Sequence, residues 1–149
     1  MQGIDVSFLI SQALYSDLRK HGEETYPHEC CGIILGKGDV NGTHVHKLIR
    51  AGNTRVDSAH NRYNIAPGEL MKAQREARQS GLDIVGFYHS HPDHPAQWSQ
   101  TDYAEAHWFG CAYVITAVDH GHATTTNSFL LSGTCEEDKR FENQPIAFE

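Results

Sequence analysis

The stretch DIVGFYHSHP, residues 83–92, limits the fold of this chain more than any other. Apolar residues run without interruption from Ile84 to Tyr88, which is typical of a strand buried in the middle of a sheet. Pro92 lacks the N–H that a central ladder needs, so we expect the strand to end near this residue. The chain therefore has to build a sheet around residues 83–89, with the polar sequence HSHP at one end of it.

Hydrophobic periodicity and turn residues predict the surrounding elements. Helices are predicted at residues 11–24, 67–80 and 99–108, with Pro67 opening the second. Further strands are predicted at residues 31–36, 43–49, 62–66, 111–118 and 124–131, and a loop at residues 53–61. The segment after Gly133 is predicted to be a polar extension that ends in a short apolar stretch at residues 145–148. Because consecutive strands pair as hairpins, we expect an α/β fold with a mixed, largely antiparallel sheet flanked by helices.

Length and charge restrict the class of protein further. A chain of 149 residues holds one core but not two ordinary ones, so we expect a single domain over residues 1–149, including a polar tail at about 133–149. The net charge of -7 argues against a nucleic-acid partner, because phosphate binding needs a basic surface. No apolar run approaches the roughly 18 residues of a membrane span.

Two further observations bear on the compartment. The N-terminus has no basic region of the kind that precedes a signal-peptide core, so the sequence predicts a cytoplasmic protein. The four cysteines form neither a C-x-x-C pair nor a dense disulfide framework, which predicts reduced and mostly buried thiols.

Two histidines and an aspartate are expected to meet at the end of the central strand. His89 and His91 are two positions apart, so their side chains project from one face. Ser99 occupies a helix N-cap position and Asp102 the first turn, and a short loop can return that turn to the strand end. Two imidazoles and one carboxylate then converge with a fourth position left free, which is the composition of a catalytic zinc site rather than a closed structural one.

Hydrolysis at such a site also needs a base that carries the proton from water to the leaving group. Glu29, immediately before the first predicted strand, is the best candidate. His28 and Glu29 begin like the H-E-x-x-H motif, but Gly32 replaces its second histidine. Glu29 is therefore expected to reach the site across the fold.

The combined pattern resembles the JAMM (MPN+) metalloprotease family: a distant glutamate, then His-x-His-Pro, six residues, serine, two residues and aspartate. Every position has its counterpart here, namely Glu29, His89, His91, Pro92, Ser99 and Asp102. The likeness covers roughly residues 9–131 and is strongest to the compact bacterial branch. It implies the JAMM/MPN fold, which is similar to that of cytidine deaminases.

The resemblance also implies roles and a substrate. His89, His91 and Asp102 would bind one Zn2+ per chain, Glu29 would activate water, and Ser99 would donate a hydrogen bond to the developing oxyanion. The bond cleaved would be the peptide or isopeptide bond after the C-terminal Gly-Gly of a ubiquitin-like sulfur carrier protein. A chain-specific deubiquitinase is not expected, because the 47 residues after Asp102 are already needed for a helix and a hairpin. The oligomeric state stays open.

Each of these residues also has a simpler interpretation. The two histidines could be a hydrogen-bonded pair at a sheet end, Ser99 an ordinary N-cap, Asp102 a partner of the helix dipole, and Glu29 a solvated loop carboxylate. Cys30 raises a thiol-protease hypothesis, which no histidine and asparagine arrangement supports. Residues outside the pattern have interpretations of their own. His44, His46, His120 and His122 are interpreted as surface histidines, and His94 is not expected to be a ligand. Trp98 and Tyr103 could line a substrate groove or only pack. The resemblance also implies that Asn53 and residues 62–67 support the site and the substrate tail.

Two other functions remain open at the level of sequence. One is a non-catalytic scaffold or binding module of the same fold, although such relatives usually lack a metal ligand and none is missing here. The other is a zinc hydrolase that acts on a small-molecule amide with the same side chains.

Overall fold

The computed structural model describes residues 6–53 and 64–149. Within them the chain forms eight strands in one sheet and three helices. The strands are β1 (Ser7–Ile10), β2 (Cys31–Asp39), β3 (Gly42–Ala51), β4 (Asp83–Pro92), β5 (Ala112–Asp119), β6 (His122–Ser132), β7 (Arg140–Gln144) and β8 (Ile146–Phe148). The helices are α1 (Gln12–Thr25), α2 (Pro67–Gln79) and α3 (Gln100–Glu105). None of these helices is both long and apolar enough to cross a membrane.

Strand β4 lies inside the sheet, as its sequence predicted. The strand order is β7-β6-β5-β4-β2-β3-β1-β8, with β4 antiparallel to β2 and parallel to β5. Cys31 at the start of β2 pairs with His89, so the chain just before β2 lies beside the last residues of β4. Beyond that point β4 continues beside β5 alone, until Pro92 pairs with Val118. Pro92 therefore sits where the strand has lost one neighbour, which is where its missing N–H is tolerated.

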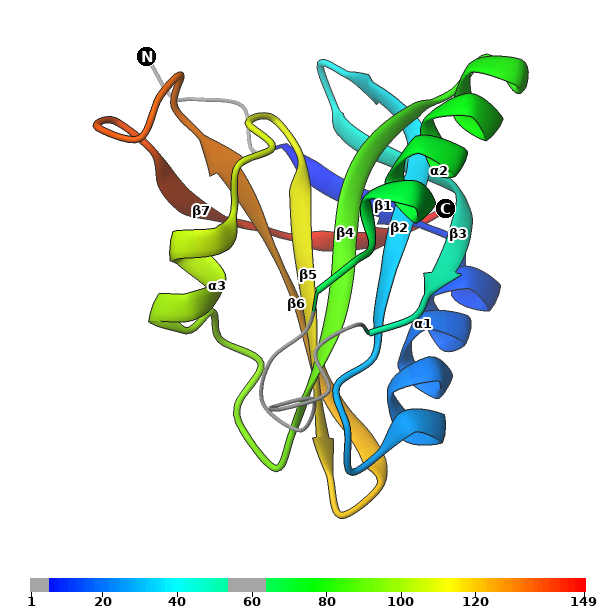
Figure 1. Ribbon diagram of the computed structural model, residues 1–149, viewed down its shortest axis with the longest axis vertical. Coiled ribbons are helices and arrows are strands. Elements are labelled where there is room, and N and C mark those ends of the chain that lie inside the picture. The colour runs from blue at the N-terminus through cyan, green and yellow to red at the C-terminus, as the bar shows by residue number, and fades with distance from the viewer. Residues whose placement is uncertain (1–5, 54–63) are drawn as a thin grey trace.

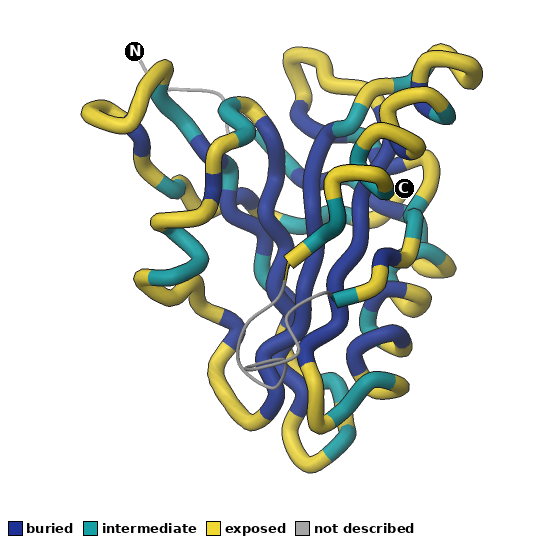
Figure 2. The backbone as a smooth tube through the Cα atoms, viewed as in Figure 1, coloured by how far each residue is buried: buried dark blue, intermediate teal, exposed yellow. Residues whose placement is uncertain are grey.

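The sheet is covered on both faces, which confirms the expected α/β class with a mixed sheet flanked by helices (Figure 1). On one face Leu18 of α1 packs with Phe8, Tyr88 and Val114. On the other face Ala73 of α2 packs with a second group of buried side chains that includes Ile33, Leu35 and Phe87. Figure 2 shows the central strands buried over most of their length, with exposed residues gathered in the helices and turns. Such burial on both faces explains the continuous apolar sequence of β4.

The face of β4 that carries Tyr88 is fixed by a close packing contact. A Cβ at Gly32 would lie 2.1 Å from the Tyr88 ring, so only glycine leaves room for the ring there. The Tyr88 hydroxyl lies 2.8 Å from Nδ1 of the buried His21 on α1. Tyr88 is thereby held toward α1, and the alternation of the strand turns the neighbouring His89 to the opposite face.

The main correction concerns the segment after Gly133, which is not a polar extension. Strand β7 pairs antiparallel with β6 at one edge of the sheet, and β8 pairs parallel with β1 at the other. Only Pro145 separates these two strands. Figure 1 shows this red segment crossing behind the sheet from β6 to β1. The C-terminal segment thus occupies both outer positions of the sheet.

Smaller differences concern element ends. Strand β1 was not expected, because four residues beside a helix give too little alternation to identify. Helix α3 ends at Glu105 rather than near residue 108, and Trp108 instead packs edge-on against Phe87 at 5.2 Å. Residues 64–66 are not a strand. The rest of that predicted strand, and residues 54–61 of the predicted loop, lie outside the described residues.

Candidate metal centre and active site

The side chains of His89, His91 and Asp102 meet at the end of β4. The two Nε2 atoms are 3.2 Å apart. Oδ1 of Asp102 lies 3.3 Å from Nε2 of His89, and Oδ2 lies 3.1 Å from Nε2 of His91. Among the described residues this is the one group of three or more His, Cys, Asp or Glu side chains with ligand atoms close enough to share an ion.

Local structure accounts for this convergence. Strand alternation places the two histidines on one face of β4. Asp102 is brought to them by the N-terminus of α3, where the Ser99 hydroxyl accepts from Asp102 N at 3.0 Å and Ser99 N donates to Asp102 Oδ2 at 2.9 Å. This reciprocal capping box holds the carboxylate against the helix start. The N-cap interpretation of Ser99 is thereby confirmed.

A second contact orients the ring of His91. Its Nδ1 donates to the carbonyl of Pro95 at 2.9 Å, because a carbonyl oxygen can only accept. Nε2 therefore presents a lone pair toward His89 and Asp102 in the neutral ring. Such a hydrogen bond on the far nitrogen is the usual way in which proteins orient a metal-binding imidazole.

Burial and charge act against each other in this cluster. His89 and His91 are 2% and 8% exposed. Burial lowers the pKa of His89. It would also lower that of His91, but the contacts with Asp102 and Pro95 outweigh it and raise the pKa. Burial alone would raise the pKa of Asp102, yet the two neighbouring histidines hold it well below its usual range. The carboxylate thus stays ionised beside two imidazoles.

The donor set fits a small divalent cation. Zinc binds imidazole nitrogen and carboxylate oxygen at about 2.0 to 2.2 Å, so donors at the corners of a tetrahedron lie roughly 3.3 to 3.5 Å apart. The three separations of 3.1, 3.2 and 3.3 Å are close to that edge length. Two lone pairs and a carboxylate that face one another repel unless a cation or protons lie between them. The cluster therefore has both the spacing and the charge of a metal site.

Glu29 lies beside this cluster, as the pairing of β2 with β4 requires. It lines a cavity of about 470 Å³ together with His91, Trp98 and Ser99. The residue is 4% exposed, so the interpretation as a solvated loop carboxylate is wrong. Its buried Oε1 has no hydrogen-bond partner among the described residues. Burial raises the pKa of Glu29 to about 8, and the negative charges of Asp102 and Glu105 contribute while His91 opposes them.

Ser90 and Asn53 hold the backbone next to Glu29. The Ser90 hydroxyl, which points away from the two histidines, accepts from Cys30 N at 2.8 Å. Asn53 Nδ2 donates to the Glu29 carbonyl at 3.4 Å. Its Oδ1 accepts from Asn64 N at 3.0 Å. The expected support of the site by Asn53 thus has a physical basis, whereas Arg62 and Tyr63 lie outside the described residues.

The thiol-protease hypothesis for Cys30 has no support. The residue is 3% exposed, and burial raises the pKa of its thiol to about 11. A reactive cysteine needs the opposite shift, because the thiolate is the nucleophile. All four cysteines are free, and Cys135 alone is exposed rather than buried.

The histidines outside the predicted cluster take other positions. His46, His120 and His122 are exposed, as predicted. His44 is half-buried between Asp39 at 2.9 Å and Glu149 at 3.1 Å. His94 lines the cavity beside Glu29 but is not one of the three clustered ligands.

Sequence reasoning missed the residues that hold α3 from outside, above all Lys139 and Phe141. The ring of Phe141 lies 5.8 Å from that of Tyr103 and 5.5 Å from that of Trp98. Trp98 and Tyr103 therefore pack against the C-terminal segment. The only sequence signal was an isolated phenylalanine in a polar tail.

The fold and this cluster define the class of protein. A mixed α/β sheet with two histidines, an aspartate and a buried glutamate at one end is the arrangement that the resemblance to JAMM proteases implied. The chain belongs to the family of prokaryotic homologs of the JAB domain, whose model matches residues 11–132.

Individual relatives agree with this assignment. The chain is 32% identical over 109 residues to desampylase of Haloferax volcanii, covering 72% of this chain and 75% of that protein. It is 31% identical over 110 residues to a probable TtuB-protein conjugate cleaving protease of Thermus thermophilus, covering 74% and 70%. A solution structure from Salinibacter ruber has a TM-score of 0.71 at 34% identity, covering 95% of this chain and 91% of that one. One from Desulfitobacterium hafniense, with a TM-score of 0.80 at 22% identity over 95% and 92%, shares the fold.

Proposed function

We propose that this protein is a zinc-dependent metallopeptidase that hydrolyses the peptide or isopeptide bond after the C-terminal Gly-Gly of a ubiquitin-like sulfur carrier protein. One observation carries the proposal: a cluster of two imidazoles and a carboxylate lies beside the buried Oε1 of Glu29, which has no hydrogen-bond partner in the part of the chain that the structure describes. In a site built only for structure, nearly all buried polar atoms have a hydrogen-bond partner.

The relatives support the reaction class. One is named as a desampylase and another as a probable protease that cleaves TtuB-protein conjugates. Cleavage of a protein conjugate means hydrolysis of an amide bond at the end of one protein chain, which agrees with the resemblance to JAMM proteases. The free thiols of all four cysteines are consistent with a protein that functions in a reducing compartment, which we propose is the cytoplasm.

The roles follow from where each side chain lies. His89, His91 and Asp102 would hold one zinc ion per chain, which when bound polarises the substrate carbonyl and acidifies water. In its ionised form, Glu29 takes the proton of the attacking water and delivers it to the leaving nitrogen. The Ser99 hydroxyl accepts from Asp102 N. Its own proton is therefore available to donate to the developing oxyanion.

The direct test is cleavage of a ubiquitin-like carrier that bears a few residues after Gly-Gly, followed by mass spectrometry. We expect loss of those residues, no cleavage after treatment with a chelator, and recovery when zinc is restored. Glu29→Gln should lower kcat/KM by about a hundredfold or more while the zinc content stays near one ion per chain. Undiminished cleavage by this variant would remove Glu29 from its role.

Matched histidine variants test the metal centre by elemental analysis. His89→Ala should lose the bound metal, and His46→Ala, on the exposed part of β3, should keep it. The same donor types bind iron in some oxygenases, so elemental analysis also identifies which metal this site binds. Absence of any bound metal would favour a non-catalytic scaffold. Zinc without cleavage of any carrier would favour a small-molecule amide as the substrate.

A further inference from the structure

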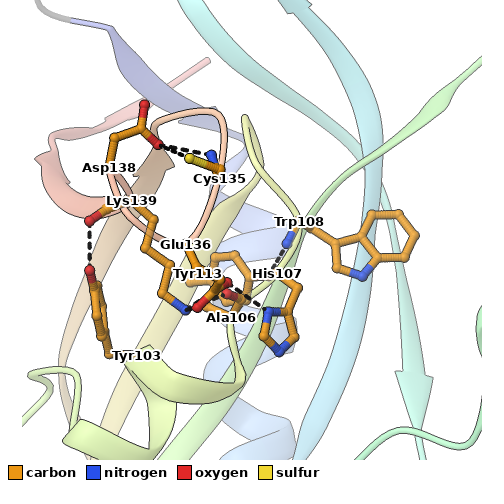
Figure 3. A network of polar contacts seen from close by, with 9 residues as sticks. All are labelled: Tyr103, Ala106, His107, Trp108, Tyr113, Cys135, Glu136, Asp138 and Lys139. Atoms are coloured by element: carbon orange, nitrogen blue, oxygen red, sulfur yellow. Dashed lines mark hydrogen bonds and ion pairs between the residues drawn. The ribbon is translucent and has the colours of Figure 1, made fainter.

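The C-terminal segment outside the family match packs against the helix that carries Asp102. The match ends at residue 132, and residues 133–139 form the connection from β6 to β7. Figure 3 shows this connection lying over the end of α3, with the Lys139 side chain extending toward Ala106 and the Tyr103 side chain reaching back toward the Lys139 backbone.

Lys139 is almost completely buried, which is unusual for a lysine. Its side chain is 2% exposed, and Nζ donates to the carbonyl of Ala106 at 3.1 Å. That carbonyl belongs to the C-cap residue of α3, where a helix has acceptors without internal partners and a partial negative charge. Nζ also lies 3.0 Å from Oε1 of Glu136 and 4.7 Å from the centre of the Tyr103 ring. The ammonium thus contacts a carbonyl, a carboxylate and the face of a ring in place of water.

A second connection runs in the opposite direction. The hydroxyl of Tyr103, the residue next to Asp102, donates to the Lys139 carbonyl at 2.6 Å. The Tyr103 ring also packs against Phe141 at the start of β7. Backbone and side chain of the C-terminal segment therefore both contact α3.

Helix α3 needs such outside contacts. It has six residues and none of them is buried. Isolated helices shorter than about 12 residues are marginal in water, and most helices in proteins are held by an apolar face. The capping box at its start includes Asp102 itself, so it cannot fix that carboxylate independently of the helix. Contacts from residues outside α3 therefore have to hold the helix in place.

We propose that Lys139 is a positioning residue for Asp102: by holding the C-terminal end of α3 it keeps the carboxylate within reach of His89 and His91. The inference rests on the metal centre of the proposed function. It assigns the segment after residue 132 a part in building the site, beyond its part in the sheet.

The test compares zinc affinity in Lys139→Met with that in the wild type, by competition with a chromophoric chelator. Methionine keeps the buried apolar stem but removes the ammonium. We expect a roughly tenfold to hundredfold weaker affinity, as for other contacts that orient metal ligands. Lys37→Met is the matched control, because Lys37 is exposed and its ion pair with Asp83 is far along β2 from the site. It should bind zinc as the wild type does.

A double-mutant cycle separates positioning from general destabilisation. In an Asp102→Ala background, Lys139→Met should change the remaining zinc affinity by less than about twofold, since its effect is transmitted through Asp102. An equal loss in both backgrounds would overturn the inference. So would unchanged affinity in Lys139→Met together with a lower free energy of unfolding.

Two further measurements cover the remaining outcomes. If Lys139→Met does not fold, Tyr103→Phe removes only the hydroxyl that bonds the Lys139 carbonyl, and a weaker zinc affinity is again expected. If the wild type itself binds no metal, the metal centre of the proposed function fails. Amide exchange of α3 in metal-free protein then decides this inference: faster exchange of Tyr103 N–H in Lys139→Met supports it, and unchanged exchange overturns it.

Discussion

A single residue, His21, links α1 to β4 on the sheet face opposite the candidate site. The side chain is buried on α1, with Nδ1 2.8 Å from the Tyr88 hydroxyl. Burial, assisted by the nearby charge of Arg50 and opposed by that of Glu24, lowers the pKa of His21 to about 4. The folded protein therefore keeps this histidine neutral where an unfolded chain would protonate it.

This shift predicts a loss of stability in mild acid. Between the unfolded pKa of 6.5 and the folded value of about 4, the unfolded chain binds more protons, so the free energy of unfolding falls as the pH falls. From pH 6.5 to 5 the contribution is roughly 1 to 2 kcal/mol. Urea denaturation should show a smaller acid-induced loss in His21→Gln than in the wild type, because the other titrating groups cancel in the difference. If the free energy of unfolding fell equally with pH in the two proteins, the lowered pKa of His21 would be contradicted.

The residues of the candidate site could be identified from sequence because they lie in short segments. His89 and His91 follow from strand alternation, and Ser99 and Asp102 from a helix start, so local rules bring them together. Lys139 could not be identified in this way. Its partner carbonyl is 33 residues away, and an isolated lysine in a polar segment is exposed in most proteins. Assignment of ligand and catalytic roles stays a prediction until the variants are measured.

At the scale of elements, the two serine-capped helices differ in what else holds them. Ser11 accepts from Leu14 N at 3.1 Å, and Ser99 accepts from Asp102 N at 3.0 Å. Helix α1 has 14 residues and buries Leu18 and His21 among others, whereas α3 has six and buries none. The same cap therefore stabilises a long helix with buried residues in one case and a short helix without any in the other.

Removal of each cap should have a different consequence. Ser11→Ala should lower the free energy of unfolding by about 1 kcal/mol, because α1 unfolds with the core. Ser99→Ala should barely change it, but should accelerate amide exchange at Tyr103 by roughly fivefold, because α3 can open locally. Denaturation curves and hydrogen exchange measure the two effects. Equal losses of global stability would show that α3 unfolds only together with the sheet.

The elements found from sequence were those with a clear period or clear boundaries. Helix α2 begins at Pro67, and β4 is a nearly continuous apolar run. Strands β7 and β8 lack both signals: RFENQ alternates weakly and IAF has three residues. They are strands because the edges of the sheet offer them unpaired backbone groups. That information lies in the rest of the fold and not in their own sequence.

At the scale of the whole molecule, the C-terminal segment joins the two edges of the sheet. Gln144 stands at the junction, 4% exposed. Its Oε1 accepts from the Ser128 hydroxyl of β6 at 2.8 Å, and its Nε2 donates to the Thr43 hydroxyl of β3 at 3.2 Å. One buried amide thus connects strands from opposite halves of the strand order. Ser128 and Thr43 are themselves buried, at 2% and 5% exposure.

Gln144→Ala should therefore be costly although no apolar side chain is lost. It removes two buried hydrogen bonds, and each hydroxyl left without this partner costs about 1 to 3 kcal/mol. We expect a loss of at least about 2 kcal/mol, or a melting temperature roughly 4 to 8 °C lower for a chain of this size. Asn143→Ala is the matched control, because Asn143 is the adjacent, exposed residue of β7. Similar small effects of the two variants in thermal unfolding would mean that backbone pairing alone closes the sheet, and that Gln144 adds nothing to it.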